Sequence, residues 1–111
     1  MTDSNNIDRL KAFLEEDPSD AFSRYALALE QAKSGQMTEA IRSLEYLKDK
    51  QKDYLALYYQ LGKFHESLGN IPKAVTNYKE GIKFATLQQN RHTLNELKQA
   101  LSEISDAEDD V

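Results

Sequence analysis

Cysteine is absent from this 111-residue chain, which excludes disulfide bonds, thiol nucleophiles and thiolate metal sites. Glycine is scarce, and its four residues are too scattered to form a phosphate-binding loop. Positive charge is also in deficit, because 14 Lys and Arg stand against 19 Asp and Glu, giving a net charge of −5. Binding to duplex phosphates needs a clustered excess of cations, so we expect no nucleic-acid partner.

Long apolar runs are missing too, as is a charged-then-apolar leader. We therefore expect no membrane partner and a soluble, acidic, cytoplasmic protein. With only two histidines, an enzyme is not expected either. His65 and Glu66 imitate the start of a zinc-protease motif, but the second histidine one helical turn later is missing. A packed histidine is the favoured interpretation, and we predict no metal, no cofactor and no catalytic residue.

An internal repeat of 34 residues is the strongest positive signal in the chain. Such an interval corresponds to one two-helix unit of a helical solenoid. Antiparallel helices approach closely only where one of them carries Gly or Ala, which predicts helix contacts at Ala28, Gly62, Ala40 and Ala74. Laying residues 21–54 over residues 55–88 pairs apolar or small residues: Leu27 with Leu61, Ala28 with Gly62, Gly35 with Gly69, Met37 with Ile71, Ala40 with Ala74, and Leu44 with Tyr78.

Both units also carry the elements of a known motif. The second reads Tyr58-x2-Leu61-Gly62-x2-His65 and then Ala74-x3-Tyr78, and the first reads Arg24-x2-Leu27-Ala28-x2-Gln31 and then Ala40-x3-Leu44. With these residues the chain resembles the tetratricopeptide repeat (TPR) family, whose pattern is Trp-x2-Leu-Gly-x2-Tyr, Ala-x3-Phe and Pro. Neither unit ends in the family proline, since Lys52 and Thr86 stand there. The resemblance implies an all-α, right-handed solenoid of helical hairpins.

The expected organisation is a single TPR-like domain over residues 1–105, followed by a disordered acidic tail at 106–111. Residues 5–18 form a leading half repeat, 21–54 the first repeat, 55–88 the second repeat, and 89–105 a C-terminal capping helix. Asp20 and Asp53 are predicted helix N-caps. We expect about six helices, at residues 5–16, 20–33, 37–50, 54–68, 71–86 and 89–105.

In this architecture the first helices of successive repeats line a concave groove, which the resemblance places here at nine residues. Tyrosine suits such a groove because it buries a large apolar face and keeps a hydroxyl available, although packing of the same aromatics into the core is the alternative. The predicted partner-binding groove consists of Phe22, Tyr25, Leu29, Ala56, Tyr59, Lys63, His92, Asn95 and Gln99.

We therefore expect a protein-interaction module, or scaffold, that binds a peptide or partner protein in this groove. The alternative is a structural subunit that self-associates, as a homodimer, through the exposed edges of the solenoid. Two full repeats are fewer than the three or so that a stable stack usually needs.

Some TPR domains bind the acidic C-terminal peptides of heat-shock chaperones through a clamp of lysine, asparagine and arginine. We predict against that type of binding here, because no cation stands ready to meet a terminal carboxylate. The corresponding places hold Tyr25, Leu29, Gln60, His92 and Glu96.

Overall fold

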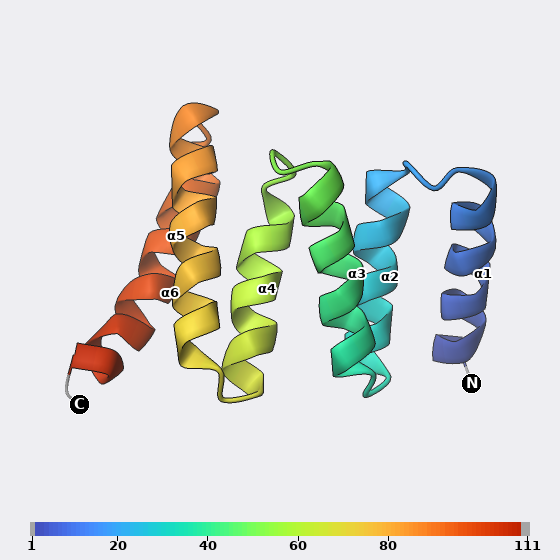
Figure 1. Ribbon diagram of the computed structural model, residues 1–111, viewed down its shortest axis with the longest axis horizontal. Coiled ribbons are helices and arrows are strands. Elements are labelled where there is room, and N and C mark those ends of the chain that lie inside the picture. Colours follow the sequence, from blue (N-terminus) through green and yellow to red (C-terminus); the bar gives the residue numbers. More distant parts are fainter. Residues whose placement is uncertain (1, 110–111) are drawn as a thin grey trace. The chain divides into compact units, whose positions relative to one another are not determined.

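The computed structural model describes residues 2–109, with side chains over 6–105, and all the regular structure in this part of the chain is helical (Figure 1). Every observed helix overlaps one of the six predicted segments. The helices are α1 (Thr2–Glu16), α2 (Ala21–Lys33), α3 (Met37–Lys50), α4 (Ala56–Ser67), α5 (Ile71–Leu87) and α6 (Arg91–Asp109).

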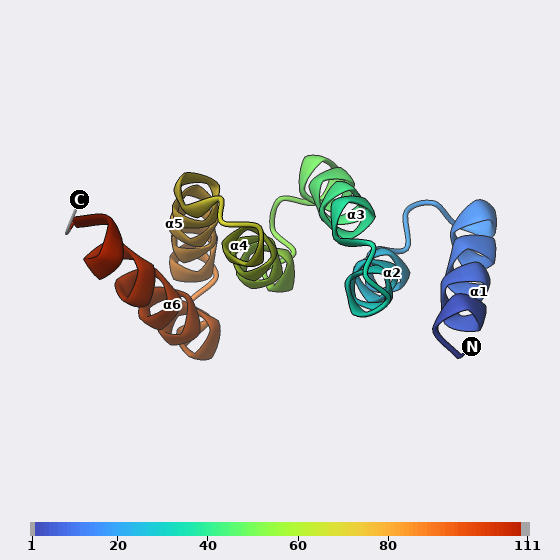
Figure 2. The same cartoon turned by 90° about the horizontal axis from the view of Figure 1, so that it is seen from below.

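The chain divides into two compact units, Met1–Tyr54 and Leu55–Val111, so the division falls where one repeat was predicted to give way to the next. In the first unit α2 packs against both α1 and α3. In the second unit α5 packs against both α4 and α6, as Figure 2 shows from below. Each unit is thus built from antiparallel helix pairs that share a central helix. Whether the two units unfold as one domain stays a prediction.

The small residues predicted at helix contacts are all buried in the structure. Ala28, Ala40 and Ala74 are fully buried. A Cβ added at Gly62 would overlap the ring of Tyr78 on α5. The prediction of close helix approach is confirmed at Gly62, and the three alanines are buried as that prediction requires.

A second glycine contact, at Gly81 on α5, was not predicted. A Cβ there would lie 2.6 Å from Tyr58 Cβ and 2.9 Å from Leu97 Cδ1, too close for either side chain to stay in place. Gly81 falls at the repeat position of Leu47, so a pattern of small residues shared by both repeats does not reveal it.

The core of the first unit includes residues of the predicted leading half repeat, which itself stays a prediction. Ile7, Leu14 and Leu27 form a buried cluster against which Leu10 packs. Phe13, a large apolar residue of the same helix, is 53% exposed. The residues at 7, 10 and 14 follow intervals of three and four and form one stripe of the helix, and Phe13 lies beside that stripe.

The second unit has the larger aromatic core. Tyr58 and Tyr78 are fully buried, and the Tyr58 ring stacks on Phe84 with centroids 5.6 Å apart. Tyr58 occupies the tryptophan place of the motif. His65 is buried as well, which confirms the interpretation of a packed histidine. From α6, Leu97 closes this core.

The helix ends follow the sequence signals in most places. Gly35 and Gly69 have φ of 82° and 76°, the left-handed conformation expected after a helix. Pro72 lies in the first turn of α5. The prediction for Asp53 is wrong, because α4 begins later and its N-cap position is Leu55. Residues 52 and 53 instead form a turn before the helix.

At the C-terminus, α6 continues to Asp109, so the predicted disordered tail is helical at residues 106–109. Neither glycine nor proline follows Ile104, so nothing in the backbone ends the helix there. Residues 110–111 of the predicted tail lie outside the described residues.

Asp20 caps α2, and this contact gives a pH-dependent prediction. Its carboxylate accepts hydrogen bonds from Ser23 Oγ (2.7 Å) and Ser23 N (3.2 Å). These hydrogen bonds hold the pKa of Asp20 below its ordinary value of 3.8. A depressed native pKa stabilises the fold above the unfolded pKa, and that stability disappears as the pH falls through the native value.

We therefore expect Asp20→Ala to have a lower urea midpoint than the wild type at pH 7. The difference between the two midpoints should shrink as the pH falls through the lowered pKa of Asp20, where the wild type loses the same contact. Asp20→Asn, which keeps the cap without a titrating charge, serves as the control and should stay close to the wild type at pH 7. If the difference in urea midpoint between the wild type and Asp20→Ala is the same at pH 7 and below the pKa of Asp20, the assignment of the cap is contradicted.

Candidate partner-binding cleft

The nine predicted groove residues lie on three helices, and the structure leaves all nine at least partly accessible to solvent. They divide between the two compact units, and each set is described within its own unit. Phe22, Tyr25 and Leu29 lie on α2 in the first unit. In the second unit, α4 carries Ala56, Tyr59 and Lys63, and α6 carries His92, Asn95 and Gln99.

On α2, the three predicted residues follow intervals of three and four and so share one face of the helix. Phe22 is 72% exposed, whereas Tyr25 and Leu29 are half-buried. The Tyr25 ring packs at a tilt against Tyr54, with centroids 5.7 Å apart. Tyr25 therefore fits both interpretations of the aromatics in part, because it packs on a neighbouring ring and is also accessible for a partner.

In the second unit a cleft of about 290 Å³ opens between α4 and α6. It brings together three of the predicted residues, Tyr59, Lys63 and Gln99, but Ala56, His92 and Asn95 are not among its lining residues. The remaining lining residues, all from α6, are Glu96, Ala100 and Glu103.

Glu96 and Glu103 were not part of the predicted groove, yet the sequence held a signal for them. The lining residues at 96, 99 and 103 are spaced by three and four, the interval of one helix face. If Gln99 lies in the groove, helix geometry places Glu96 and Glu103 on the same face and therefore in the groove as well. That extension changes the charge of the site, because it adds two carboxylates.

Tyr59 forms the aromatic wall of the cleft and is held by its neighbours. Its ring is tilted by 46° to that of buried Tyr78, with centroids 6.3 Å apart. The Tyr78 hydroxyl donates a hydrogen bond to Glu66. Burial, followed by this contact with Glu66, raises the pKa of Tyr78 far above its usual range, so the hydroxyl stays protonated as a donor.

Lys63 is held at the same wall by two neighbours. Its Nζ lies 5.5 Å from the centroid of the Tyr59 ring and 3.9 Å from Glu66 Oε2. Across the cleft, His92 Nε2 lies 3.4 Å from Glu96 Oε2 at an exposed site. The cleft thus combines an aromatic face, an amide and charges of both signs, a set suited to holding a side chain of a partner.

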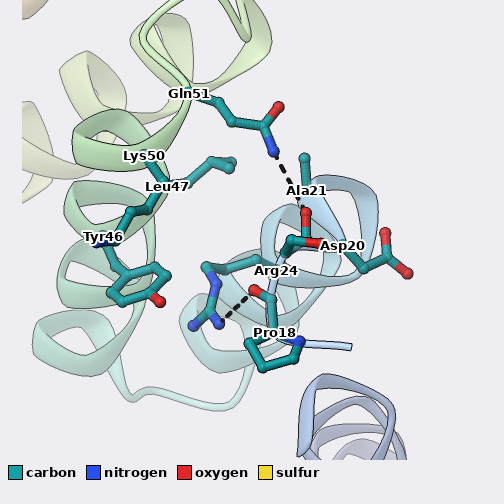
Figure 3. Close-up of a pocket in the computed structure, with 9 residues that line it drawn as sticks. Pro18, Asp20, Ala21, Arg24, Tyr46, Leu47, Lys50 and Gln51 are labelled. Carbon is teal, nitrogen blue, oxygen red and sulfur yellow. Dashed lines mark hydrogen bonds between the residues drawn. The ribbon is translucent and has the colours of Figure 1, made fainter. Parts of the chain in front are cut away.

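A second hollow, in the first unit, lies where the loop between α1 and α2 meets the end of α3 (Figure 3). Its walls are joined by contacts within the chain. The Arg24 guanidinium lies 3.9 Å from the Tyr46 ring centroid and donates a hydrogen bond to Pro18 O at 3.1 Å. Gln51 Nε2 donates to Ser19 O at 3.3 Å. These contacts fix the loop to α3, and we interpret the hollow as structural.

In the part of the chain that the structure describes, no three His, Cys, Asp or Glu side chains gather as a metal site would require. Over the same residues, no helix has both the length and the apolar character that crossing a membrane demands.

Several solved structures have a fold similar to that of this chain. The chain is 37% identical to a tetratricopeptide repeat domain protein of Salinibacter ruber, with a TM-score of 0.75 over 78% of this chain and 88% of that one. PcrH, solved in complex with the chaperone binding region of PopD, has a TM-score of 0.88 at 15% identity, covering 96% of this chain and 81% of PcrH. A protein of Bordetella parapertussis has a TM-score of 0.78 at 22% identity, covering 91% and 88%.

No family model matches the sequence, and the comparison with curated proteins finds no match. The similarity to the Salinibacter protein is nonetheless decisive, because it combines sequence identity with a shared fold over most of both chains. The chain belongs to the tetratricopeptide repeat family. Its predicted fold class, an all-α solenoid type built from helical hairpins, is confirmed.

Proposed function

We propose that this protein is an interaction module that takes a short segment of a partner protein into the cleft between α4 and α6. The observation that carries the proposal is that Tyr59, Lys63 and Gln99, expected at a groove from the repeat pattern, line one cleft. The exposed face of α2, with Phe22, Tyr25 and Leu29, is proposed as a second contact surface. The absence of enzymatic activity stays a prediction.

The dimensions and chemistry of the cleft favour a linear segment. About 290 Å³ accommodates a few side chains of an extended or helical peptide. Tyr59 is half-buried and backed by Tyr78, so it offers contact area at little further entropic cost. PcrH, a protein of the same fold, was solved with a region of PopD bound, which is consistent with this use of the fold.

The proposal is tested by comparing what wild type and two variants capture from an extract of the source cell. The double variant Tyr25→Ala/Tyr59→Ala removes one aromatic from each predicted surface. Tyr46→Ala, which changes an exposed tyrosine outside both surfaces, is the matched control. Circular dichroism first checks that all three chains are equally helical.

We expect at least one protein to be captured by the wild type and the control and to be reduced about tenfold or more with the double variant, as for interface aromatics that contribute more than 1 kcal/mol. Direct titration of that purified protein then measures the loss of affinity. Equal capture by all three chains would contradict the proposal.

Self-association is the second candidate, and one observation favours it. Phe13 on α1 and Phe22 on α2 are both large, apolar and more than half exposed in the first unit. A doubled mass in sedimentation together with a melting temperature that rises with protein concentration would support a homodimer. A monomer with a constant melting temperature leaves partner binding as the better account.

A further inference from the structure

We propose that the cleft between α4 and α6 receives a basic side chain, lysine or arginine, from a linear segment of the partner. This inference rests on the proposed function and names the chemistry of the partner at the same site. Its occupant is therefore of opposite charge to the acidic chaperone tails that the family's cationic clamp binds.

The charged residues that line the cleft favour a cation. Glu96 and Glu103 contribute two carboxylates from α6, whereas Lys63 contributes the positive charge of the lining. That charge is offset by Glu66, whose Oε2 lies 3.9 Å from Lys63 Nζ. The lining thus carries two carboxylates against one cation, and an incoming cation gains from that balance. Like charge disfavours an acidic segment by the same reasoning.

The aromatic wall of the cleft, Tyr59, also favours a cation. The face of a tyrosine ring attracts cations, and Lys63 Nζ already lies 5.5 Å from the Tyr59 centroid. A guanidinium or ammonium entering between Tyr59 and the two glutamates meets a ring face on α4 and carboxylates on α6. Because the aliphatic stem of the same side chain packs on the ring while its head meets the carboxylates, both parts of the residue are used.

The polar residues that α6 contributes to the cleft lie in a row along the helix. Glu96 and Glu103 stand seven residues apart on one face of α6, with Gln99 between them. Two turns of helix thus present carboxylate, amide and carboxylate in a row. A peptide following this row meets the amide as a neutral hydrogen-bond partner for its backbone and the carboxylates as partners for its basic side chains.

The test uses a phage-displayed library of random 12-residue peptides, selected on the immobilised full chain at low ionic strength. We expect the recovered peptides to be enriched in Lys or Arg. A selected peptide should bind the Glu96→Gln/Glu103→Gln variant about tenfold more weakly, roughly the sum of two partly exposed ion pairs. The variant Glu16→Gln/Glu45→Gln removes two exposed carboxylates elsewhere and should change the affinity less than twofold.

A variant that is expected to bind more tightly adds a control, because a misfolded chain would bind more weakly. Lys63→Gln removes the positive charge from the lining, so it should strengthen binding of the same peptide several-fold. Replacing the basic residue of the peptide with norleucine should abolish both effects. No change, or weaker binding, with Lys63→Gln would count against the inference.

The outcomes separate the inference from the proposed function. Peptides that lack basic residues but lose binding with Tyr59→Ala overturn the charge assignment and leave the cleft as the docking site. Peptides that are insensitive to both Tyr59→Ala and the glutamate variant count against the cleft altogether. Failure to enrich any peptide, or enrichment of acidic ones, also overturns the inference.

Discussion

Replacing Leu97 with alanine is expected to lower the free energy of unfolding by about 2–5 kcal/mol, the range for a leucine removed from a closed core. Leu97 is fully buried, and its Cδ1 lies close enough to Gly81 that an added Cβ would sit 2.9 Å away. The side chain therefore fills the space between α5 and α6. Truncation leaves a cavity that the backbone of α5 cannot close without moving.

Urea unfolding followed by circular dichroism measures this loss. Leu87→Ala is the matched control, because Leu87 at the end of α5 is 70% exposed and its truncation should change stability by no more than about 0.5 kcal/mol. We also expect Leu97→Ala to weaken partner binding, since Glu96, Gln99 and Glu103 are positioned by the same helix. A loss below about 1 kcal/mol would mean that α6 is not held by this contact.

The second large effect on stability is expected at Gly62 and Tyr78, which are in contact between α4 and α5. The overlay pairs Ala28 with Gly62 and Leu44 with Tyr78. All four residues are buried, and in the second repeat the larger tyrosine occupies the space that a Cβ at residue 62 would need. By the overlay, the first repeat carries alanine and leucine at the two positions where the second repeat carries glycine and tyrosine.

We expect Gly62→Ala alone to destabilise the protein by about 1–2 kcal/mol, because overpacking against Tyr78 outweighs the gain of about 1 kcal/mol in helix propensity. Tyr78→Leu alone should cost about 2–4 kcal/mol, since it leaves a cavity and removes the hydrogen bond to Glu66. The double variant recreates the pair of the first repeat, so its loss should be smaller than the sum of the two by about 1–2 kcal/mol.

The cycle is measured by urea unfolding of the four chains. A parallel cycle of Gly62→Ala with Lys79→Ala, an exposed residue next to Tyr78 in sequence, should be additive within about 0.5 kcal/mol. Additivity in the Gly62 and Tyr78 cycle would show that the two residues do not share a crossing.

The fold was predictable because the signals that determine it are local and repeated. A 34-residue interval, small residues at Ala28 and Gly62, and glycines able to take positive φ place the helices close to their observed bounds. Asp53 was misplaced as an N-cap because residues 52 and 53 form a turn and α4 begins only at Ala56. The contact at Gly81 was not predicted, because its partner Tyr58 corresponds to Arg24 in the first repeat, so the two repeats share no pattern there.

The site was only partly predictable, because a repeat pattern assigns helix faces and does not give side-chain directions. Tyr59, Lys63 and Gln99 were expected at a groove and share the lining of one cleft. His92 and Asn95, on the same helix as Gln99, remain exposed outside its lining. Glu103 lies one turn beyond Gln99 on the same helix face, and the structure shows that this turn also lines the cleft.

The claim that the cleft between α4 and α6 is the docking site is tested most directly by site-specific photocross-linking to the captured partner. A benzophenone side chain is placed at Gln99, within the lining, and in a second chain at Lys79, an exposed residue of α5 that is not in the lining. We predict cross-linking of the partner from residue 99, reduced by Tyr59→Ala, and little or none from residue 79. Equal cross-linking from both positions, or cross-linking from residue 79 alone, would contradict the claim.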